Sequence, residues 1–438
     1  MTRTIVLHPA QRATAHENDE AGARLAEAES LTRALDLDLR ESEIAWLRTP
    51  HPATLFGPGK VDEISARING AEIELVVVNG PLTPVQQRNL EKAWSTKVLD
   101  RTGLILEIFG ERAQTREGVL QVDLAHLNYQ KSRLVRSWTH LERQRGGAGF
   151  MGGPGERQIE SDRRQIDDRI NALRRQLEKV VKTRSLHRAS RKKVPYPVVA
   201  LVGYTNAGKS TLFNKLTAAN VMAEDMLFAT LDPTMRQLVL PSGRTVILSD
   251  TVGFISDLPT QLIAAFRATL EEVLEADLVV HVRDIANART DAQKSDVDAV
   301  LKDLGLGDEA LAGMLEVLNK TDLLCPEDLS SVENRVARAP GLLSLSAVSG
   351  DGMQALLSEI DSKLFPVNLL SNLRIDHADG RAVAWLYEHG HVLDRADHDA
   401  GVSLTVELTT KEYRQFSKEF PAIMRDFDCS GLPELAAE

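Results

Sequence analysis

The chain has 438 residues, of which 43% are hydrophobic and 26% charged; this balance excludes wholesale disorder and suggests about three domains. Its formal net charge of −11 gives no general affinity for nucleic acid, so any such binding must come from a local basic patch. Two cysteines exclude a disulfide framework, a polar N-terminus predicts no signal peptide, and no apolar run is long enough to predict a membrane span.

The first part of the chain, residues 1–112, alternates strand-like and helix-like stretches. A helix is predicted over residues 83–94, because Thr83 is a good N-cap and Pro84 suits the first helical position. Short apolar runs predict strands at residues 4–7, 44–47, 74–78 and 97–99. This alternation predicts a small α/β domain.

The middle of the chain, residues 113–193, is basic. From Lys131 to Lys193 there are 18 Lys and Arg against 7 Asp and Glu, a net charge of +11, so the rest of the chain carries −22. Two heptad-like apolar stripes flank a glycine-rich run at residues 145–155, which cannot continue a helix. The patterns predict two antiparallel helices joined by a flexible basic tip. The alternative is a helical linker with solvated charges.

Beyond residue 194, short apolar runs alternate with helical stretches. The runs lie at residues 198–202, 245–248, 278–282, 315–318 and 342–345. This repeat predicts a doubly wound parallel sheet over residues 194–365. His281 and Arg283 alternate within one run and are expected to line a sheet edge.

The last part, residues 366–438, predicts a small C-terminal α/β domain. Apolar and polar residues alternate at 402–408, as in a half-buried strand, and residues 413–420 have a helical pattern. No residues there suggest a chemistry.

A phosphate-binding signature follows the strand at 198–202. The run Gly203-Tyr204-Thr205-Asn206-Ala207-Gly208-Lys209-Ser210 matches G-x-x-x-x-G-K-[ST] and precedes a predicted helix at 211–216. Its glycines let backbone N–H groups wrap phosphates, and the helix N-terminus adds partial positive charge. Lys209 is expected to reach the β- and γ-phosphates, and Ser210 to bind Mg²⁺. Residues 194–365 are therefore predicted to be a P-loop nucleotide-binding domain.

Three further loops with fitting chemistry follow later strands in order: Asp250-Thr251-Val252-Gly253, Asn319-Lys320-Thr321-Asp322 and Ser346-Ala347-Val348. Asp250 is expected in the Mg²⁺ shell, and Gly253 is expected to present its N–H to the γ-phosphate. Asp322 can accept two hydrogen bonds from guanine that adenine cannot donate, so GTP is predicted. Asn319 is expected at the N7/O6 edge of the base, Lys320 along its plane, and a backbone N–H of the last loop at O6.

The ordered loops resemble those of the translation-factor-related P-loop GTPases. The run Phe228-Ala229-Thr230-Leu231-Asp232-Pro233-Thr234 resembles the first switch of the Obg–HflX group. Upstream segments resemble the HflX family itself: residues 56–60, 100–104, 115–118 and 153–156, together with Gln158. The likeness extends from about residue 50 to about residue 350.

The resemblance implies a cytoplasmic GTPase with GTP and GDP as substrate and product. Thr230 is the implied third Mg²⁺ ligand beside Ser210 and Asp250, with Thr234 as its rival. The implied catalytic residues are Lys209, Thr230 and Gly253. The family also implies binding to the large ribosomal subunit, with the splitting or rescue of stalled or idle ribosomes as the output.

One catalytic residue of related GTPases is replaced in this chain. Phe254 stands where a glutamine would orient the attacking water. We therefore expect hydrolysis that is slow alone and completed by a bound partner; the alternative is a protein that only binds GTP. Asn206 resembles the asparagine that holds K⁺ in some P-loop GTPases lacking the glutamine, so K⁺ is a candidate cofactor beside Mg²⁺.

The partner expected for the basic hairpin is ribosomal RNA. The free chain is expected to be monomeric, and peripheral membrane association is an alternative to a purely cytoplasmic location. Two other functions stay open: a large-subunit assembly factor in which GTP times release, and an ATP-driven RNA remodeller. Asn319 and Asp322 argue against the remodeller.

Overall fold

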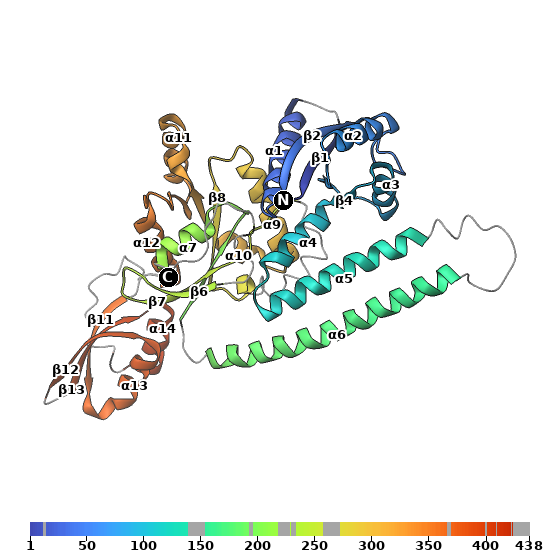
Figure 1. Cartoon of the computed structure of the whole chain (residues 1–438). Coiled ribbons are helices and arrows are strands. Elements are labelled where there is room, and N and C mark those ends of the chain that lie inside the picture. Colours follow the sequence, from blue (N-terminus) through green and yellow to red (C-terminus); the bar gives the residue numbers. More distant parts are fainter. Residues whose placement is uncertain are drawn as a thin grey trace. The chain divides into compact units, whose positions relative to one another are not determined.

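Strand–helix units build most of the chain in the computed structural model (Figure 1), which describes residues 1–11, 15–138, 154–191, 196–217, 228, 234–256, 272–365, 369–398, 401–408, 410–421 and 423. The chain divides into two compact units. The first unit holds Met1–Leu238 and Thr245–Met353, and the second holds Val239–Arg244 and Gln354–Glu438.

The N-terminal part of the first unit is a parallel sheet in the order β2-β1-β3-β4. Its strands are β1 (Arg3–Gln11), β2 (Asp38–Leu47), β3 (Leu75–Val78) and β4 (Lys97–Asp100), and its helices are α1 (Ala15–Arg33), α2 (Pro58–Gly70), α3 (Pro84–Trp94) and α4 (Arg101–Arg112). The predicted alternation is confirmed. The predicted start of α3 is also confirmed, since the side chains of Thr83 and Gln86 each accept the other's backbone N–H.

Two long helices follow, α5 (Arg116–Trp138) and α6 (Pro154–Arg191), and they run antiparallel and side by side in Figure 1. Leu120 and Ile170, from the two apolar stripes, are buried, and Lys131 forms an ion pair with Asp167 across the helices. The predicted helix pair is confirmed, because each stripe gives its helix one face to bury. The predicted tip at 145–155 lies outside the described residues except for its last two positions, which begin α6.

The second sheet of this unit has the strand order β10-β9-β8-β5-β7-β6. Its strands are β5 (Val198–Val202), β6 (Thr234–Val239), β7 (Thr245–Asp250), β8 (Leu278–Asp284), β9 (Leu315–Asn319) and β10 (Leu342–Ser344). The helices between them are α7 (Lys209–Thr217), α9 (Thr290–Asp303), α10 (Asp308–Gly313), the 3-10 turn η2 (Thr321–Leu323) and α11 (Pro326–Val336). From β10 to β7 the strands are parallel, so their carboxyl ends lie at one edge. The predicted doubly wound arrangement is confirmed.

The expected edge position of His281 and Arg283 is wrong. Their strand β8 lies between β5 and β9, and the two residues are 1% and 3% exposed. Burial, helped by the charge of Arg283, lowers the pKa of His281 to about 3, so the ring stays neutral. Arg283 forms ion pairs with Asp291 and Glu316. Alternation within one strand does not encode where that strand stands in the sheet.

The second unit contains the antiparallel sheet β11-β13-β12. Its elements are α12 (Met353–Leu364), β11 (Leu369–Asp376), the 3-10 turn η3 (His377–Asp379), α13 (Gly380–His389), β12 (His391–His398), β13 (Gly401–Leu408) and α14 (Thr410–Glu419). The alternation at 402–408 is confirmed, because Val402, Leu404, Val406 and Leu408 are buried. Within the described parts of the chain, no helix is long and apolar enough to cross a membrane.

Candidate nucleotide-binding site

The loop after β5 has a backbone shape that depends on two glycines. Gly203 and Gly208 have φ angles of +149° and +89°. A Cβ atom at Gly203 would lie 2.1 Å from the carbonyl oxygen of Val282, and one at Gly208 would lie 2.3 Å from Nδ2 of Asn319. Only glycine fits at either position. The loop leads directly into the N-terminus of α7, which begins at Lys209, and such a junction attracts anionic groups.

Lys209 and Ser210 start α7 beside this loop. Lys209 is 6% exposed, and its Nζ donates to the carbonyl oxygens of Gly203 and Tyr204 at 3.1 and 2.9 Å. Burial lowers the pKa of this amine to about 8, and the charge of Asp250 partly offsets that effect. The hydroxyl of Ser210 donates to Oδ2 of Asp250 at 2.7 Å. A hydroxyl and a carboxylate side by side are oxygen ligands that Mg²⁺ accepts, so these two residues fit a Mg²⁺ site.

The segment after β7 lies directly on the 203–208 loop. Thr205 donates its N–H to the carbonyl oxygen of Phe254 at 2.7 Å, and Phe254 donates its N–H to the carbonyl oxygen of Gly203 at 3.1 Å. Gly253 is so close that a Cβ atom there would lie 2.7 Å from Cγ2 of Thr205. The ring of Phe254 is 1% exposed and offers no hydrogen bond to a water molecule.

Asn319, at the end of β9, ties three loops together. Its Nδ2 donates to the carbonyl oxygen of Ala207 at 2.8 Å, and its Oδ1 accepts the N–H of Ala347 at 3.0 Å. The residue is 2% exposed. Its amide therefore braces the site in this conformation, whereas the sequence led us to expect it at a base edge. The N–H of Ala347, expected at O6, is used in the same brace.

Asp322 presents an exposed carboxylate beside this brace. Its Oδ1 accepts a hydrogen bond from the hydroxyl of Ser346 at 2.5 Å, which fixes the plane of the carboxylate. Lys320 adopts a φ of +67° and pairs with Asp284 at 2.8 Å. Val348 is 70% exposed at the rim. A carboxylate held in this way can accept two parallel N–H donors from a planar ring.

The predicted first switch, residues 228–234, is described only at Phe228 and at Thr234, which begins β6. The side chain of Phe228 is 2% exposed and packs edge to face on Phe109 of α4, with ring centroids 4.6 Å apart. Ala229, Thr230, Leu231 and Asp232 lie outside the described residues. The role of Thr230 as a Mg²⁺ ligand therefore stays a prediction.

Two side chains of the N-terminal part reach the site, and residue reasoning missed them. Arg101 donates to the carbonyl oxygen of Ser256 at 2.9 Å, and Glu27 accepts a hydrogen bond from the hydroxyl of Tyr204 at 2.6 Å. The only available signal was the family-like segment 100–104, to which Arg101 belongs. Glu27 lies in α1 without any distinguishing pattern.

Asp100, in the same segment, joins the N-terminal part to the helical hairpin. Its Oδ1 caps α4 by accepting the N–H of Gly103 at 2.9 Å. The same oxygen accepts the hydroxyl of Tyr129 at 2.6 Å, and Arg133 of α5 pairs with Oδ2. The carboxylate is nearly buried, so these contacts fix α5 against α4.

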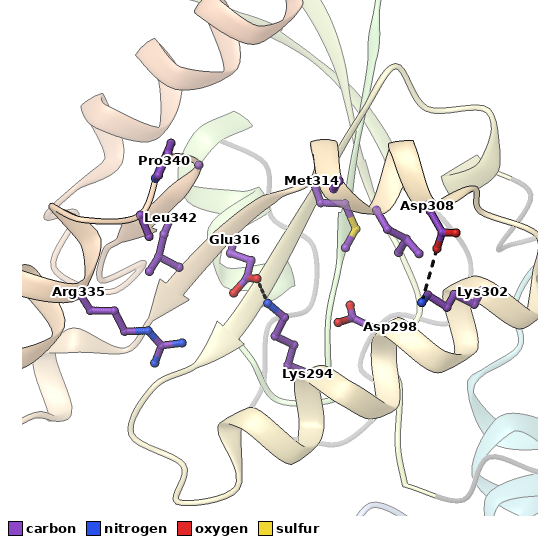
Figure 2. Close-up of a pocket in the computed structure, with 13 residues that line it drawn as sticks. Lys294, Asp298, Lys302, Asp308, Met314, Glu316, Arg335, Pro340 and Leu342 are labelled. Atoms are coloured by element: carbon purple, nitrogen blue, oxygen red, sulfur yellow. Dashed lines mark hydrogen bonds and ion pairs between the residues drawn. The ribbon is translucent and has the colours of Figure 1, made fainter.

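A separate cavity of about 600 Å³ lies away from these loops (Figure 2). Its walls come from α9, α10, the end of α11 and the amino-terminal ends of β9 and β10, opposite the strand ends that carry the loops. Charges on its walls pair with each other, Lys294 with Glu316 and Lys302 with Asp308. These pairs indicate a structural role for the four charged residues that form them.

Comparison with protein families accounts for most of the chain. Residues 22–110 match a model described as GTP-binding GTPase N-terminal, and residues 112–191 one described as GTP-binding GTPase Middle Region. Residues 198–320 match 50S ribosome-binding GTPase, and residues 331–426 match HflX C-terminal domain.

Curated relatives agree with these matches. GTPase HflX of Magnetococcus marinus is 50% identical over 378 residues, which cover 86% of this chain and 86% of that protein. GTPase HflX of Escherichia coli K12 is 41% identical over 402 residues, which cover 91% of this chain and 93% of that protein. This chain therefore belongs to the HflX family and is a P-loop GTPase, an enzyme that hydrolyses GTP.

Proposed function

We propose that this GTPase binds the large ribosomal subunit and uses GTP hydrolysis to split or rescue stalled or idle ribosomes in the cytoplasm. The proposed binding and hydrolysis of GTP rest mainly on one observation, the buried amine of Lys209 next to the hydrogen bond between Ser210 and Asp250. The proposed binding to the large ribosomal subunit is supported by the match of residues 198–320 to 50S ribosome-binding GTPases and by the basic hairpin.

The proposed phosphate site lies at the edge of the sheet where the carboxyl ends of the parallel strands meet. The 203–208 loop and Lys209 bind the β- and γ-phosphates, and Gly253 offers its N–H to the γ-phosphate. The proposed Mg²⁺ ligands are Ser210, Asp250 and Thr230. When bound, Mg²⁺ neutralises charge on the phosphates. Lys209 does the same from its fixed position, so no reorganisation is needed as charge moves to the leaving oxygen.

The proposed base site is the exposed Asp322 carboxylate. The hydroxyl of Ser346 orients it toward guanine N1–H and the 2-amino group. Adenine offers no such donor pair, and a poorly paired carboxylate would then oppose binding. The flanking residues proposed around the base are Asn319, Lys320, Thr321, Ala347 and Val348.

Hydrolysis is proposed to be slow until a partner completes the site. Phe254 cannot orient water, and its backbone is already paired with Gly203 and Thr205. A large subunit that displaces the segment around Phe254 would either supply a group that orients the attacking water or make room for one. GTP turnover measured with and without isolated large subunits tests this mechanism; equal turnover would contradict it.

Potassium is the second proposed cofactor. Asn206 is exposed within the 203–208 loop and has a φ of +59°. A K⁺ ion there would place positive charge where other GTPases use an arginine. We expect turnover to be roughly tenfold faster in KCl than in NaCl at matched ionic strength. Asn206→Ala should abolish the difference, and equal wild-type rates in both salts would remove K⁺ from the mechanism.

The hairpin is the proposed contact with ribosomal RNA. Arg174 and Arg175 are exposed on α6. We expect Arg174→Glu with Arg175→Glu to lower large-subunit affinity about tenfold or more and to flatten its salt dependence, because fewer phosphates are neutralised. Nucleotide affinity should stay unchanged. A matched control reverses the charges of Arg335, in the last turn of α11, and Arg338, two residues beyond that helix; if it weakened subunit binding equally, the hairpin would have no special role.

Sedimentation tests the proposal as a whole. The chain should co-sediment with large subunits when a non-hydrolysable GTP analogue is present and should leave them with GDP. Incubation of the chain and GTP with intact ribosomes should release free subunits. Binding independent of nucleotide would contradict a GTP-driven cycle. Accumulation of precursor subunits in cells lacking the protein, without any splitting by the purified protein, would favour the assembly-factor alternative.

A further inference from the structure

A group of four side chains, three of them buried, joins the N-terminal part to the two loops of the phosphate site. Arg101 donates to Oε2 of Glu27 at 3.0 Å and to the carbonyl oxygen of Ser256 at 2.9 Å. The hydroxyl of Tyr204 donates to Oε1 of Glu27 at 2.6 Å. Arg101, Tyr204 and Ser256 are 7%, 6% and 3% exposed, so water does not compete for these bonds. We call this group the Arg101 cluster.

The Arg101 cluster restricts the movement of the 203–208 loop and of the segment after β7. The Tyr204 hydroxyl gives its one proton to Glu27 and accepts both the N–H and the hydroxyl of Ser256, at 2.6 and 2.5 Å. Burial first, and then the charge of Glu27, raise the pKa of Tyr204, so this proton stays in place. Ser256 is held at its N–H, its carbonyl oxygen and its side chain. Tyr204 is the second residue of the phosphate loop, and Ser256 comes three residues after Gly253.

The segment held in this way lies close against Lys209 and Thr205. A Cβ atom on Gly253 would lie 3.1 Å from Nζ of Lys209 and 2.7 Å from Cγ2 of Thr205. A γ-phosphate oxygen shared by Nζ and the Gly253 N–H needs roughly 2.7–3 Å from each nitrogen, and the phosphorus and its other oxygens need further room. The room for a γ-phosphate between Lys209 and Gly253 therefore depends on how tightly this segment is held, whereas a diphosphate has no group at that position.

We infer that Tyr204, Ser256, Glu27 and Arg101 are positioning residues that set the preference between GDP and GTP. Their hydrogen bonds hold the segment after Asp250 against the phosphate loop and so favour the diphosphate. The N-terminal part thereby helps to decide which nucleotide the enzyme retains. This inference rests on the phosphate site proposed above.

Binding of GDP and of a non-hydrolysable GTP analogue to the full chain tests the inference. Tyr204→Phe keeps the ring and removes the hydroxyl, and Ser256→Ala removes one of its partners. Each should shift the ratio of the two dissociation constants about fivefold to tenfold toward the triphosphate, the size expected for one or two lost buried hydrogen bonds. The double variant Glu27→Gln/Tyr204→Phe should shift the ratio by less than its two single variants would if they acted independently. Both substitutions change the same hydrogen bond, the one from the Tyr204 hydroxyl to Glu27.

Control variants separate this inference from a general loss of structure. Arg67→Gln removes ion pairs with Glu41 and Glu43 elsewhere in the N-terminal part and should leave the ratio unchanged. Equal weakening of both nucleotides by Tyr204→Phe and Ser256→Ala would reduce the cluster to scaffolding and overturn the inference, as would an unchanged ratio. Lys209→Ala tests the site itself: if it binds nucleotide normally, the proposed phosphate site is wrong, and if it does not, a failed ratio test counts against the Arg101 cluster alone.

Discussion

Replacing Lys209 by alanine should lower the affinity for GTP on the order of 100-fold, because the proposed site gives this amine charge-assisted hydrogen bonds to the β- and γ-phosphates; the affinity for GDP, which has only the β-phosphate, should fall less. Hydrolysis at saturating GTP should fall further, since the same charge stabilises the leaving oxygens. Fluorescent-nucleotide titration measures the first effect and single-turnover hydrolysis the second.

The control for this prediction is Lys302→Ala. Lys302 is an exposed lysine of α9 with one ion pair to Asp308, 3.6 Å away, and its loss should leave nucleotide binding unchanged. Thermal unfolding of both variants verifies that each has folded. Retention of near wild-type nucleotide affinity by a folded Lys209→Ala variant would show that the nucleotide binds elsewhere.

Replacing Asp322 by asparagine should change which base the enzyme prefers. In the proposed base site the carboxylate accepts two donors from guanine. Each charge-assisted bond contributes about 1.5–3 kcal/mol, so GTP affinity should fall tenfold or more. Xanthosine triphosphate, which carries an oxygen in place of the 2-amino group, should gain relative to GTP. Competition titration of the two nucleotides against a labelled analogue measures the change in their relative affinities.

Asp328→Asn provides the matched control for base choice. Asp328 lies on the surface of α11, where it accepts a hydrogen bond from Cys325, and it carries the same charge as Asp322. Its replacement should leave both affinities as they are. If Asp322→Asn bound GTP as tightly as the wild type does, the loop after β9 would not be the base site.

Local patterns were enough to predict the α/β fold and where each loop of the candidate site stands. The apolar runs predict the strands because residues buried on both faces must be apolar. The 203–208 loop was predicted from the spacing of its glycines. The structure shows why they are needed, because any side chain at Gly203 or Gly208 would collide with Val282 or Asn319. Parallel strands then bring Lys209, Asp250 and Asp322 to one edge.

Long-range contacts decided the rest. The edge position expected for His281 failed because strand order depends on how whole elements pack. The brace made by Asn319 and the hydrogen bond from Ser346 to Asp322 each join residues more than 20 positions apart. No sequence period marks such pairs.

The sequence by itself determined the chemistry of this protein, because phosphate and guanine recognition depend on a few residue types at fixed spacing along short loops. The tertiary structure alone decided that Glu27 and Arg101, which lie more than 150 positions before their partners Tyr204 and Ser256, hold these loops in place. A buried ionic contact has no local signature. It arises only when two separately encoded surfaces pack together and each charge must find a partner away from water.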